Sequence, residues 1–209
     1  MDTIYFQGNP CHTYGTMPAV GEEAPCYHLT GLNLSEVQCS EYKGRRVVLN
    51  IFPSLDTEVC ARSVRRFNEE AASLPDTTVI CVSMDLPFAM GRFCTTENIK
   101  NVVVASAFRS PLFGQKFGVQ LCDGPLAGLL ARAVIILDKD RKVEYRELVN
   151  EITNEPDYDA ALRVLRGQYE YSTAISEFSE HSEHSELSVF SETNRGCVVI
   201  QVYVAASFF

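Results

Sequence analysis

Short apolar runs separated by stretches with a helical period constrain the fold of this chain more than any other feature. Four of them cover residues 46–52 (RVVLNIF), 78–83, 102–105 and 133–138 (AVIILD). The last three are apolar almost without interruption, which is typical of strands in a sheet that is covered on both faces. The chain is therefore expected to fold around a central sheet with two buried sides.

Helices are predicted between and after these strands. An apolar stripe with spacings of four, three, four and three residues consists of Cys60, Val64, Phe67, Ala71 and Leu74. Spacing of this kind marks one face of an α-helix. A last helix is expected to begin with Pro156 as its first residue, because the fixed φ of proline suits that position.

Two hairpins complete the expected pattern. Residues 4–6 and 11–14 flank the turn signal Gly8-Asn9-Pro10, and Lys139-Asp140 leads into a strand over residues 143–148. Strands that alternate with helices and end in a hairpin plus a helix predict an α/β sandwich.

Composition changes abruptly near residue 167. Beyond it, residues 167–209 contain one basic residue, Arg195, against six glutamates. The stretch SEFSEHSEHSELSVFSE is polar and lacks apolar periodicity, as disordered segments do. We therefore expect a folded domain over residues 1–166. A Ser/Glu/His-rich extension over 167–209 is expected to be disordered, apart from a short apolar end that can add a strand.

Charge and hydropathy exclude several classes of function. The net charge of −9 argues against a nucleic-acid partner, because binding to phosphates needs a basic face. No apolar run approaches the roughly 18 residues that span a bilayer, so no membrane partner is expected. Residues 1–10 lack the charged and apolar regions of a signal peptide, which makes the cytoplasm the expected location.

Cysteine is frequent in this chain, with 8 residues. A disulfide framework is typical of short secreted chains with small cores, which this chain does not resemble. No pair has the CxxC spacing of a zinc site. Most of these cysteines are therefore expected to be small buried side chains.

Cys60 stands in the most informative stretch, residues 50–60 (NIFPSLDTEVC), where a buried strand ends, a turn follows and a helix begins. Backbone N–H groups and the helix dipole favour a thiolate at such a position. Thr57 is close enough to donate its hydroxyl to the sulfur, and Pro53 can shield the site from water. This arrangement suits attack on an O–O bond. On spacing alone, a Cys60 that simply packs in the core is an equally good interpretation.

Longer strings around this site resemble one family. NIFPSLDTEVCARSVRRFNEEAASL, DLPFAMGRFC, GPLAGLLARAV and ELVNEITNEPDYDAAL are similar to the bacterial thiol peroxidases, the atypical two-cysteine subfamily of peroxiredoxins. The resemblance extends from about Ile4 to Leu165 and stops at the change in composition. It implies a thioredoxin-like fold with an added N-terminal β-hairpin.

The resemblance also implies roles for individual residues. Cys60 matches the peroxidatic cysteine, whose thiolate attacks the peroxide and becomes a sulfenic acid. Thr57 matches the threonine that orients peroxide and thiolate. Arg132 matches the arginine that stabilises the thiolate and the negative charge developing on oxygen. Pro53 completes the catalytic set.

Cys94 matches the resolving cysteine of the subfamily. The implied cycle closes an intrachain Cys60–Cys94 disulfide after local unfolding, because two thiols on separate helices are seldom close enough to bond. Thioredoxin is the implied reductant, and a homodimer is the implied assembly. No metal, haem or flavin cofactor is implied.

The expected function is therefore a thioredoxin-dependent peroxidase that reduces hydrogen peroxide and organic hydroperoxides. A thioredoxin-like reductase is a weaker alternative, because Thr57 stands where such an enzyme has the first cysteine of CxxC. A peroxide sensor or holdase, in which oxidation of Cys60 controls partner binding, is an alternative from another class. Five further cysteines have no role that the resemblance implies: Cys11, Cys26, Cys39, Cys81 and Cys122.

Overall fold

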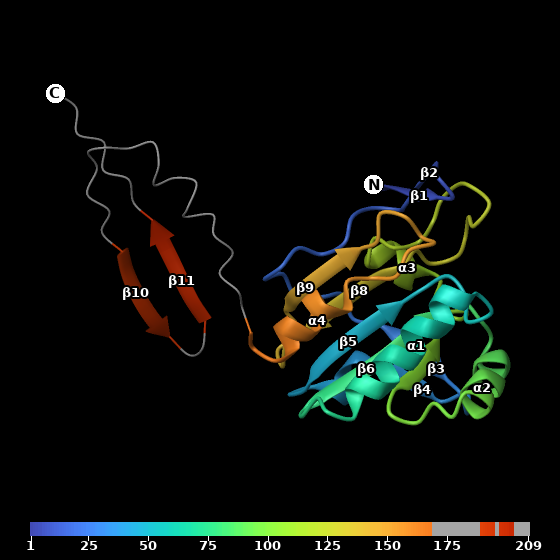
Figure 1. Ribbon diagram of the computed structural model, residues 1–209, viewed down its shortest axis with the longest axis horizontal. Helices are drawn as coiled ribbons and strands as arrows, with labels where there is room; N and C mark the ends of the chain where they lie inside the picture. The colour runs from blue at the N-terminus through green and yellow to red at the C-terminus, as the bar shows by residue number, and fades with distance from the viewer. Residues whose placement is uncertain (169–188, 195–196, 203–209) are drawn as a thin grey trace. The chain divides into compact units, whose positions relative to one another are not determined.

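The apolar run that starts at Arg46 forms strand β5 (Arg46–Ile51), near the centre of a seven-stranded sheet (Figure 1). The computed structural model describes residues 1–168 in full and the backbone of residues 189–194 and 197–202. The strand order is β4-β3-β7-β6-β5-β8-β9. The other six strands are β3 (His28–Gly31), β4 (Glu36–Gln38), β6 (Thr77–Ser83), β7 (Val103–Ser106), β8 (Ala133–Leu137) and β9 (Val143–Leu148).

The register of the sheet brings two distant segments to one edge. Strand β5 pairs in parallel with β6, and β6 with β7, so the carboxyl ends of these three strands meet. Strand β8 runs antiparallel to β5, and its first residue, Ala133, pairs with Ile51 at the end of β5. Arg132, which precedes β8, therefore lies at the edge where β5 ends.

Both faces of the sheet are buried, as the apolar runs predict. Side chains of a strand point alternately to the two faces. Val47, Leu49 and Ile51 belong to one buried apolar cluster, whereas Val48 and Phe52 belong to the other. The apolar residues of β5 are thus buried on both sides by helices and loops.

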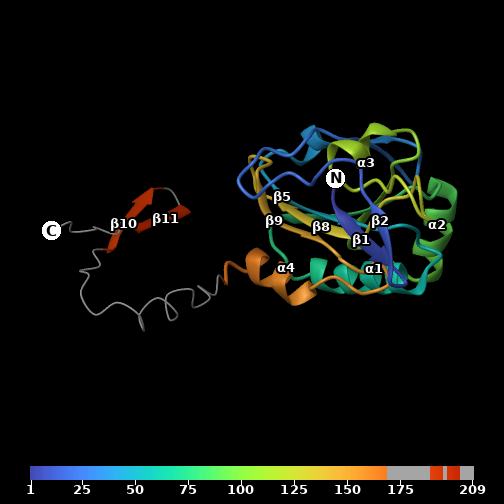
Figure 2. The ribbon, with the colours of Figure 1, turned by 90° about the horizontal axis from the view of Figure 1, so that it is seen from above.

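The helices divide between the two faces. Figure 2 shows α1 (Glu58–Ala71) and α4 (Tyr158–Leu165) on one side of the sheet, where they share a buried cluster with α2 (Pro87–Thr96). The short helix α3 (Leu112–Lys116) and the 3₁₀ turn η1 (Cys39–Tyr42) contribute to the cluster on the opposite face. The sheet is therefore the middle layer of a sandwich.

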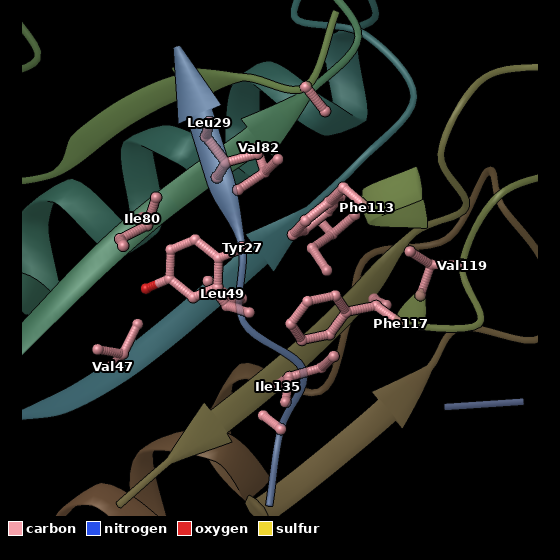
Figure 3. Close-up of a cluster of buried hydrophobic side chains, with 14 of the residues drawn as sticks. Tyr27, Leu29, Val47, Leu49, Ile80, Val82, Phe113, Phe117, Val119 and Ile135 are labelled. Atoms are coloured by element: carbon pink, nitrogen blue, oxygen red, sulfur yellow. The ribbon is translucent and has the colours of Figure 1, made fainter. Parts of the chain in front are cut away.

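Aromatic rings fill the cluster under α3 (Figure 3). The ring of Tyr27 meets that of Phe113 edge-on at a centroid distance of 6.4 Å, and Phe113 and Phe117 lie 4.8 Å apart. Tyr27 is on the segment that leads into β3, so this packing fixes the chain just before that strand.

The predicted N-terminal hairpin is present as β1 (Thr3–Phe6) and β2 (Asn9–His12), but its turn lies earlier than expected. Gln7 and Gly8 form the turn with φ values of 53° and 77°, the left-handed geometry that a two-residue hairpin turn requires. Pro10 is consequently a strand residue, which is tolerated in a two-stranded ribbon because its missing N–H need not face a partner.

Helix α4 begins later than the sequence predicts. Asp157 is its N-cap, since its carboxylate accepts the Ala160 N–H at 2.8 Å, so Pro156 lies before the helix and not at its first position. The helix ends in a Schellman motif: Gly167 has φ 68° and donates its N–H to Val164 O, while Gln168 donates to Arg163 O.

The chain divides into two compact units, Met1–Gln168 and Tyr169–Phe209. In the second unit, β10 (Val189–Asn194) pairs antiparallel with β11 (Cys197–Val202), so the apolar end contains a strand. Strand β10 falls in the part of the extension for which disorder is predicted, and the remaining residues of the extension lie outside the described residues. In the described part of the chain, no helix has the length and apolar character needed to cross a membrane.

Candidate active site

The turn after β5 is held by a carboxylate from the neighbouring strand. Asp85, which follows β6, accepts the Ser54 hydroxyl on Oδ1 and the Leu55 N–H on Oδ2, each at 2.7 Å. Its Oδ2 also accepts the Ser83 hydroxyl at 2.7 Å. These bonds fix the turn that starts at the buried Pro53 and leads into α1.

Cys60 lies in the first turn of α1 and is fully buried. Thr57 is the N-cap residue of this helix, and its side chain caps no helix N–H. Its hydroxyl lies 2.7 Å from Cys60 Sγ and 3.1 Å from the Ser54 carbonyl oxygen, so it can donate its one hydrogen to either acceptor. The sulfur is therefore held between a hydroxyl group and the amino end of a helix, which carries partial positive charge.

Arg132, the residue before β8, approaches the same sulfur. Its Nη2 lies 3.4 Å from Cys60 Sγ, and its Nε donates to Ile152 O at 2.9 Å. The side chain is nearly inaccessible to solvent, at 2% exposure. Its Nη1 has no hydrogen-bond partner within residues 1–168.

The charge of Arg132 is buried without a carboxylate partner. None of the ion pairs formed within residues 1–168 includes this guanidinium. A buried cation needs an anion or several acceptors, because it has lost its hydration. The Cys60 thiolate is the anion that the geometry offers.

The structure brings three of the five predicted site residues into direct contact: Cys60, Thr57 and Arg132. Pro53 stands in the same turn, four residues before Thr57. Cys94 lies on α2 in the same buried cluster as Cys60. Both residues are free thiols, so the two sulfurs do not form a disulfide in this structure. Burial raises the pKa of the Cys94 thiol, which keeps it protonated in this conformation.

Two groups that support the site were not found by sequence reasoning. Asp85 orders the turn, and the Ile152 carbonyl orients Arg132. The sequence does contain a signal for Asp85. This residue follows the apolar run 78–83, which is the next run along the chain after the one that leads into Pro53. No sequence signal marks the carbonyl, because any residue supplies one.

The described residues contain no group of three or more His, Cys, Asp or Glu side chains arranged to hold a metal ion. The chemistry that the site offers is that of a buried cysteine sulfur with a guanidinium and a hydroxyl beside it.

Comparison with known proteins agrees with this site. The sequence model of the Redoxin family matches residues 19–162. The thiol peroxidase of Corynebacterium glutamicum is 55% identical over 165 residues, which cover 79% of this chain and 99% of that one. The thiol peroxidase of Mycobacterium tuberculosis is 52% identical with the same coverage.

Solved structures agree as well. A peroxiredoxin-like protein from Aquifex aeolicus superposes with a TM-score of 0.76 at 42% identity, covering 80% of this chain and 97% of that one. A thiol peroxidase from Chromobacterium violaceum shares the fold, with a TM-score of 0.71 at 21% identity over 79% of this chain and 95% of that one.

The chain belongs to the Redoxin family and has its thioredoxin-like fold, with the N-terminal β-hairpin that the sequence predicts. Within that family it is a thiol peroxidase, an enzyme that reduces peroxides with electrons from thiols. The resemblance stated from the sequence is thereby confirmed.

Proposed function

We propose that Cys60 is the peroxidatic cysteine. Its thiolate attacks the terminal oxygen of a hydroperoxide, a new S–O bond forms, and the O–O bond breaks. The sulfur is oxidised to sulfenic acid, and the departing oxygen leaves as an alcohol, or as water from hydrogen peroxide, after it takes up a proton. The observation that carries this proposal is the contact of Cys60 Sγ with both Thr57 and Arg132.

Arg132 and Thr57 would act on the peroxide as well as on the sulfur. The unpartnered Nη1 of Arg132 can donate to a peroxide oxygen while Nη2 remains beside the thiolate. Thr57 is exposed and its hydroxyl also reaches the sulfur, so a peroxide that enters from solvent meets this side chain first. Pro53, buried in the same turn, would exclude water from the reacting atoms.

Cys94 is proposed as the resolving cysteine. Its sulfur would attack Sγ of the Cys60 sulfenic acid, expel the oxygen as water and leave an intrachain disulfide. Both side chains are buried on different helices and unbonded in this conformation, so α1 or α2 must unwind locally for the bond to form. A thioredoxin-type dithiol would then reduce the disulfide by exchange.

A homodimer is proposed on the basis of exposed apolar side chains. Phe88 is 70% exposed at the start of α2, and Leu86, Phe108 and Leu112 are also exposed. Phe93, on the same helix, packs against the buried cluster instead. The cytoplasmic location and the division into a folded domain and an extension remain predictions.

Turnover distinguishes this mechanism from a sensor or holdase. Wild-type protein with thioredoxin, thioredoxin reductase and a hydroperoxide is expected to consume NADPH continuously, and Cys60→Ser is expected to lose nearly all of this consumption. A single stoichiometric oxidation of the wild type, followed by no further consumption, would favour the sensor. Cys81→Ser is the matched control, because Cys81 is also fully buried but contacts neither Thr57 nor Arg132.

A further inference from the structure

Two cysteines that take no part in the peroxidase site lie against each other at the protein surface. Cys26 is exposed in the segment before β3, and Cys39 is the buried first residue of η1. Their sulfur atoms are 2.6 Å apart, and both residues are free thiols. This is a contact between two nucleophilic groups, one of which solvent can reach.

The backbone already holds these residues side by side. Strands β3 and β4 pair His28 with Gln38, and the Cys39 N–H donates to Tyr27 O at 3.2 Å, which continues the pairing by one step. Joining the sulfurs therefore needs no unwinding of a helix. In this respect the pair differs from Cys60 and Cys94.

Arg141 places a positive charge over both sulfurs. Its Nη1 donates to Cys26 Sγ and lies 3.3 Å from Cys39 Sγ, while its Nη2 pairs with Glu23. Arg141 has φ 66° in the turn between β8 and β9, a left-handed conformation that favours glycine. A guanidinium in this position stabilises a thiolate.

The electrostatic balance at Cys39 agrees with the geometry. Burial disfavours its thiolate, but hydrogen bonds from Cys26 and from the Tyr27 backbone, together with the Arg141 guanidinium, lower the pKa of Cys39 overall. The comparison is Cys81, which is fully buried without a cation and whose pKa burial raises to about 12. Cys39 thus differs from a thiol that only fills space.

A surface pocket of about 340 Å³ gives small molecules access to the pair. Its walls include Lys43, Lys139 and Arg141 as well as both cysteines. A metal ion is a poor occupant, because the described residues supply no third ligand and the guanidinium would repel a cation. A redox reaction of the two thiols is the remaining chemistry.

The pair is separate from the peroxidase site. Arg132 precedes β8 and contacts Cys60, whereas Arg141 follows the same strand and contacts Cys26 and Cys39. A strand rises about 3.4 Å per residue, so the five residues of β8 separate the two arginines by roughly 17 Å along the strand. Direct exchange between Cys60 and this pair is not possible in this conformation.

We propose that Cys26 and Cys39 form a second redox-active thiol pair, which hydroperoxide converts to an intrachain disulfide and a dithiol reduces again. One thiolate attacks the peroxide, the O–O bond breaks, and an alcohol leaves as the sulfur becomes a sulfenic acid. The second thiol then attacks that sulfur and expels water. Two thiols and one hydroperoxide thus give one disulfide, one alcohol and one water.

The test uses the full chain with Cys60→Ser and Cys94→Ser, so that its result does not depend on the peroxidase mechanism. After treatment with one equivalent of tert-butyl hydroperoxide, mass spectrometry of the digest is expected to show a linked Cys26–Cys39 peptide pair. Dithiothreitol should remove it. Cys122 is the internal control, because it is a half-buried thiol bonded only to a carbonyl oxygen.

Arg141→Met should slow formation of the disulfide by at least about tenfold, since the adjacent guanidinium favours the thiolate that attacks the peroxide. Lys43→Met, in the same pocket but not bonded to either sulfur, should leave the rate within about twofold. Equal rates for both variants would overturn the role of Arg141.

The proposal is overturned if Cys26 and Cys39 remain free thiols while Cys122 is oxidised, or if Cys26 links to a second chain in preference to Cys39. Wild-type protein provides an independent measurement that needs no substitution. In dithiothreitol buffers of increasing oxidised fraction, the Cys26–Cys39 link should appear before any link to Cys81 or Cys122, and the reverse order would contradict the proposal.

Discussion

Arg132 donates its Nε hydrogen to Ile152 O at 2.9 Å, and this bond orients the guanidinium so that Nη2 lies 3.4 Å from Cys60 Sγ. Ile152 is held in turn by the N-terminal hairpin, because its N–H donates to Tyr5 O at 2.8 Å. The hairpin is thus connected to the buried thiol through three hydrogen bonds, by way of Ile152 and the Arg132 side chain. It belongs to the support of the active site.

Replacement of Arg132 tests the electrostatic part of the mechanism. Arg132→Met is expected to lower the rate of Cys60 oxidation by about 10²–10³, the usual effect of removing a donor that stabilises developing charge. Arg132→Lys should recover only part of the rate, since an ammonium group cannot bond Ile152, the sulfur and the peroxide with one rigid fork. Stopped-flow measurement of single-turnover peroxide reduction checks both variants.

Arg66→Met is the matched control, because Arg66 forms an ion pair with Glu70 on the exposed side of α1. Its rate should equal that of the wild type. A rate for Arg132→Met within twofold of wild type would remove Arg132 from the site.

Two substitutions of Thr57 test whether its hydroxyl group is needed for peroxide reduction. Thr57→Val is nearly isosteric and is expected to slow peroxide reduction by about 10²–10³. Thr57→Ser, which keeps the hydroxyl, should remain near the wild-type rate. Melting temperatures of both should stay close to that of the wild type, because the Thr57 side chain caps no helix N–H. A rate for Thr57→Val close to that of the wild type would show that the hydroxyl is not required.

Sequence reasoning found the strands whose burial on both faces leaves a continuous apolar run, such as β5 and β8, within one or two residues. It did not find β3 and β4, because strands of four and three residues carry too few positions for a pattern. Pro156 was expected to begin a helix, but the Asp157 carboxylate caps it, and the helix begins two residues later at Tyr158.

The same contrast holds for the sites. Cys60 and Thr57 are close in sequence and share a turn, so their contact follows from local spacing. Arg132 was placed only by resemblance, since its contact with Cys60 depends on the register of β8 against β5. The contact of Cys26 with Cys39 and Arg141 joins three separate segments, and no spacing in the sequence indicates it.

Resolution by Cys94 predicts a specific disulfide. Peroxide treatment of the wild type should give a linked Cys60–Cys94 peptide pair by mass spectrometry. Cys94→Ser should consume one equivalent of peroxide and then stop as sulfenic acid or oxidise further. Formation of the bond should also increase hydrogen exchange in α1 or α2, because these helices must unwind.

Cys81→Ser is the control, since Cys81 is buried in the same cluster as Cys94. It should still form the Cys60–Cys94 disulfide. A Cys60–Cys81 link in the wild type, with Cys94 free, would contradict the assignment.

The next prediction concerns Glu151, whose hydrogen bonds to the N-terminal hairpin should make the stability of the protein depend on pH. Its carboxylate accepts the N–H groups of Gly8, Thr153 and Gln7, and the bond from Gly8 contributes most to lowering the pKa of Glu151 from 4.5 to about 2. A carboxyl whose pKa is lower in the folded state adds stability above its unfolded pKa. That contribution is lost as the pH falls from about 4.5 toward 2.

Glu151→Gln should therefore melt below the wild type at pH 7, and the two melting temperatures should converge as the pH falls through that window. Glu36→Gln, at an exposed position of β4, should show a small difference that does not follow this course. A gap for Glu151→Gln that stays constant between pH 7 and pH 3 would show that its charge does not hold the hairpin.

The last prediction concerns the extension after α4. The contacts that define the peroxidase site, from the Asp85 carboxylate to the Ile152 carbonyl, all lie within residues 1–168. A chain that ends at Gln168 keeps both bonds of the Schellman motif that closes α4, because Gly167 and Gln168 remain to donate their N–H groups. It should retain the turnover and the melting temperature of the full chain.

A chain that ends at Arg166 is the matched control. It lacks both donors, so the carbonyl groups of Val164 and Arg163 lose their partners in the protein, and the last turn of α4 should fray. Its melting temperature should fall by a few degrees while turnover changes little, since α4 covers the sheet and supplies no atom to the sulfur. The measurements are NADPH consumption in the thioredoxin-coupled assay and the melting temperature, each for the full chain and for the two shortened chains. A tenfold loss of turnover in the chain that ends at Gln168 would show that the extension takes part in catalysis.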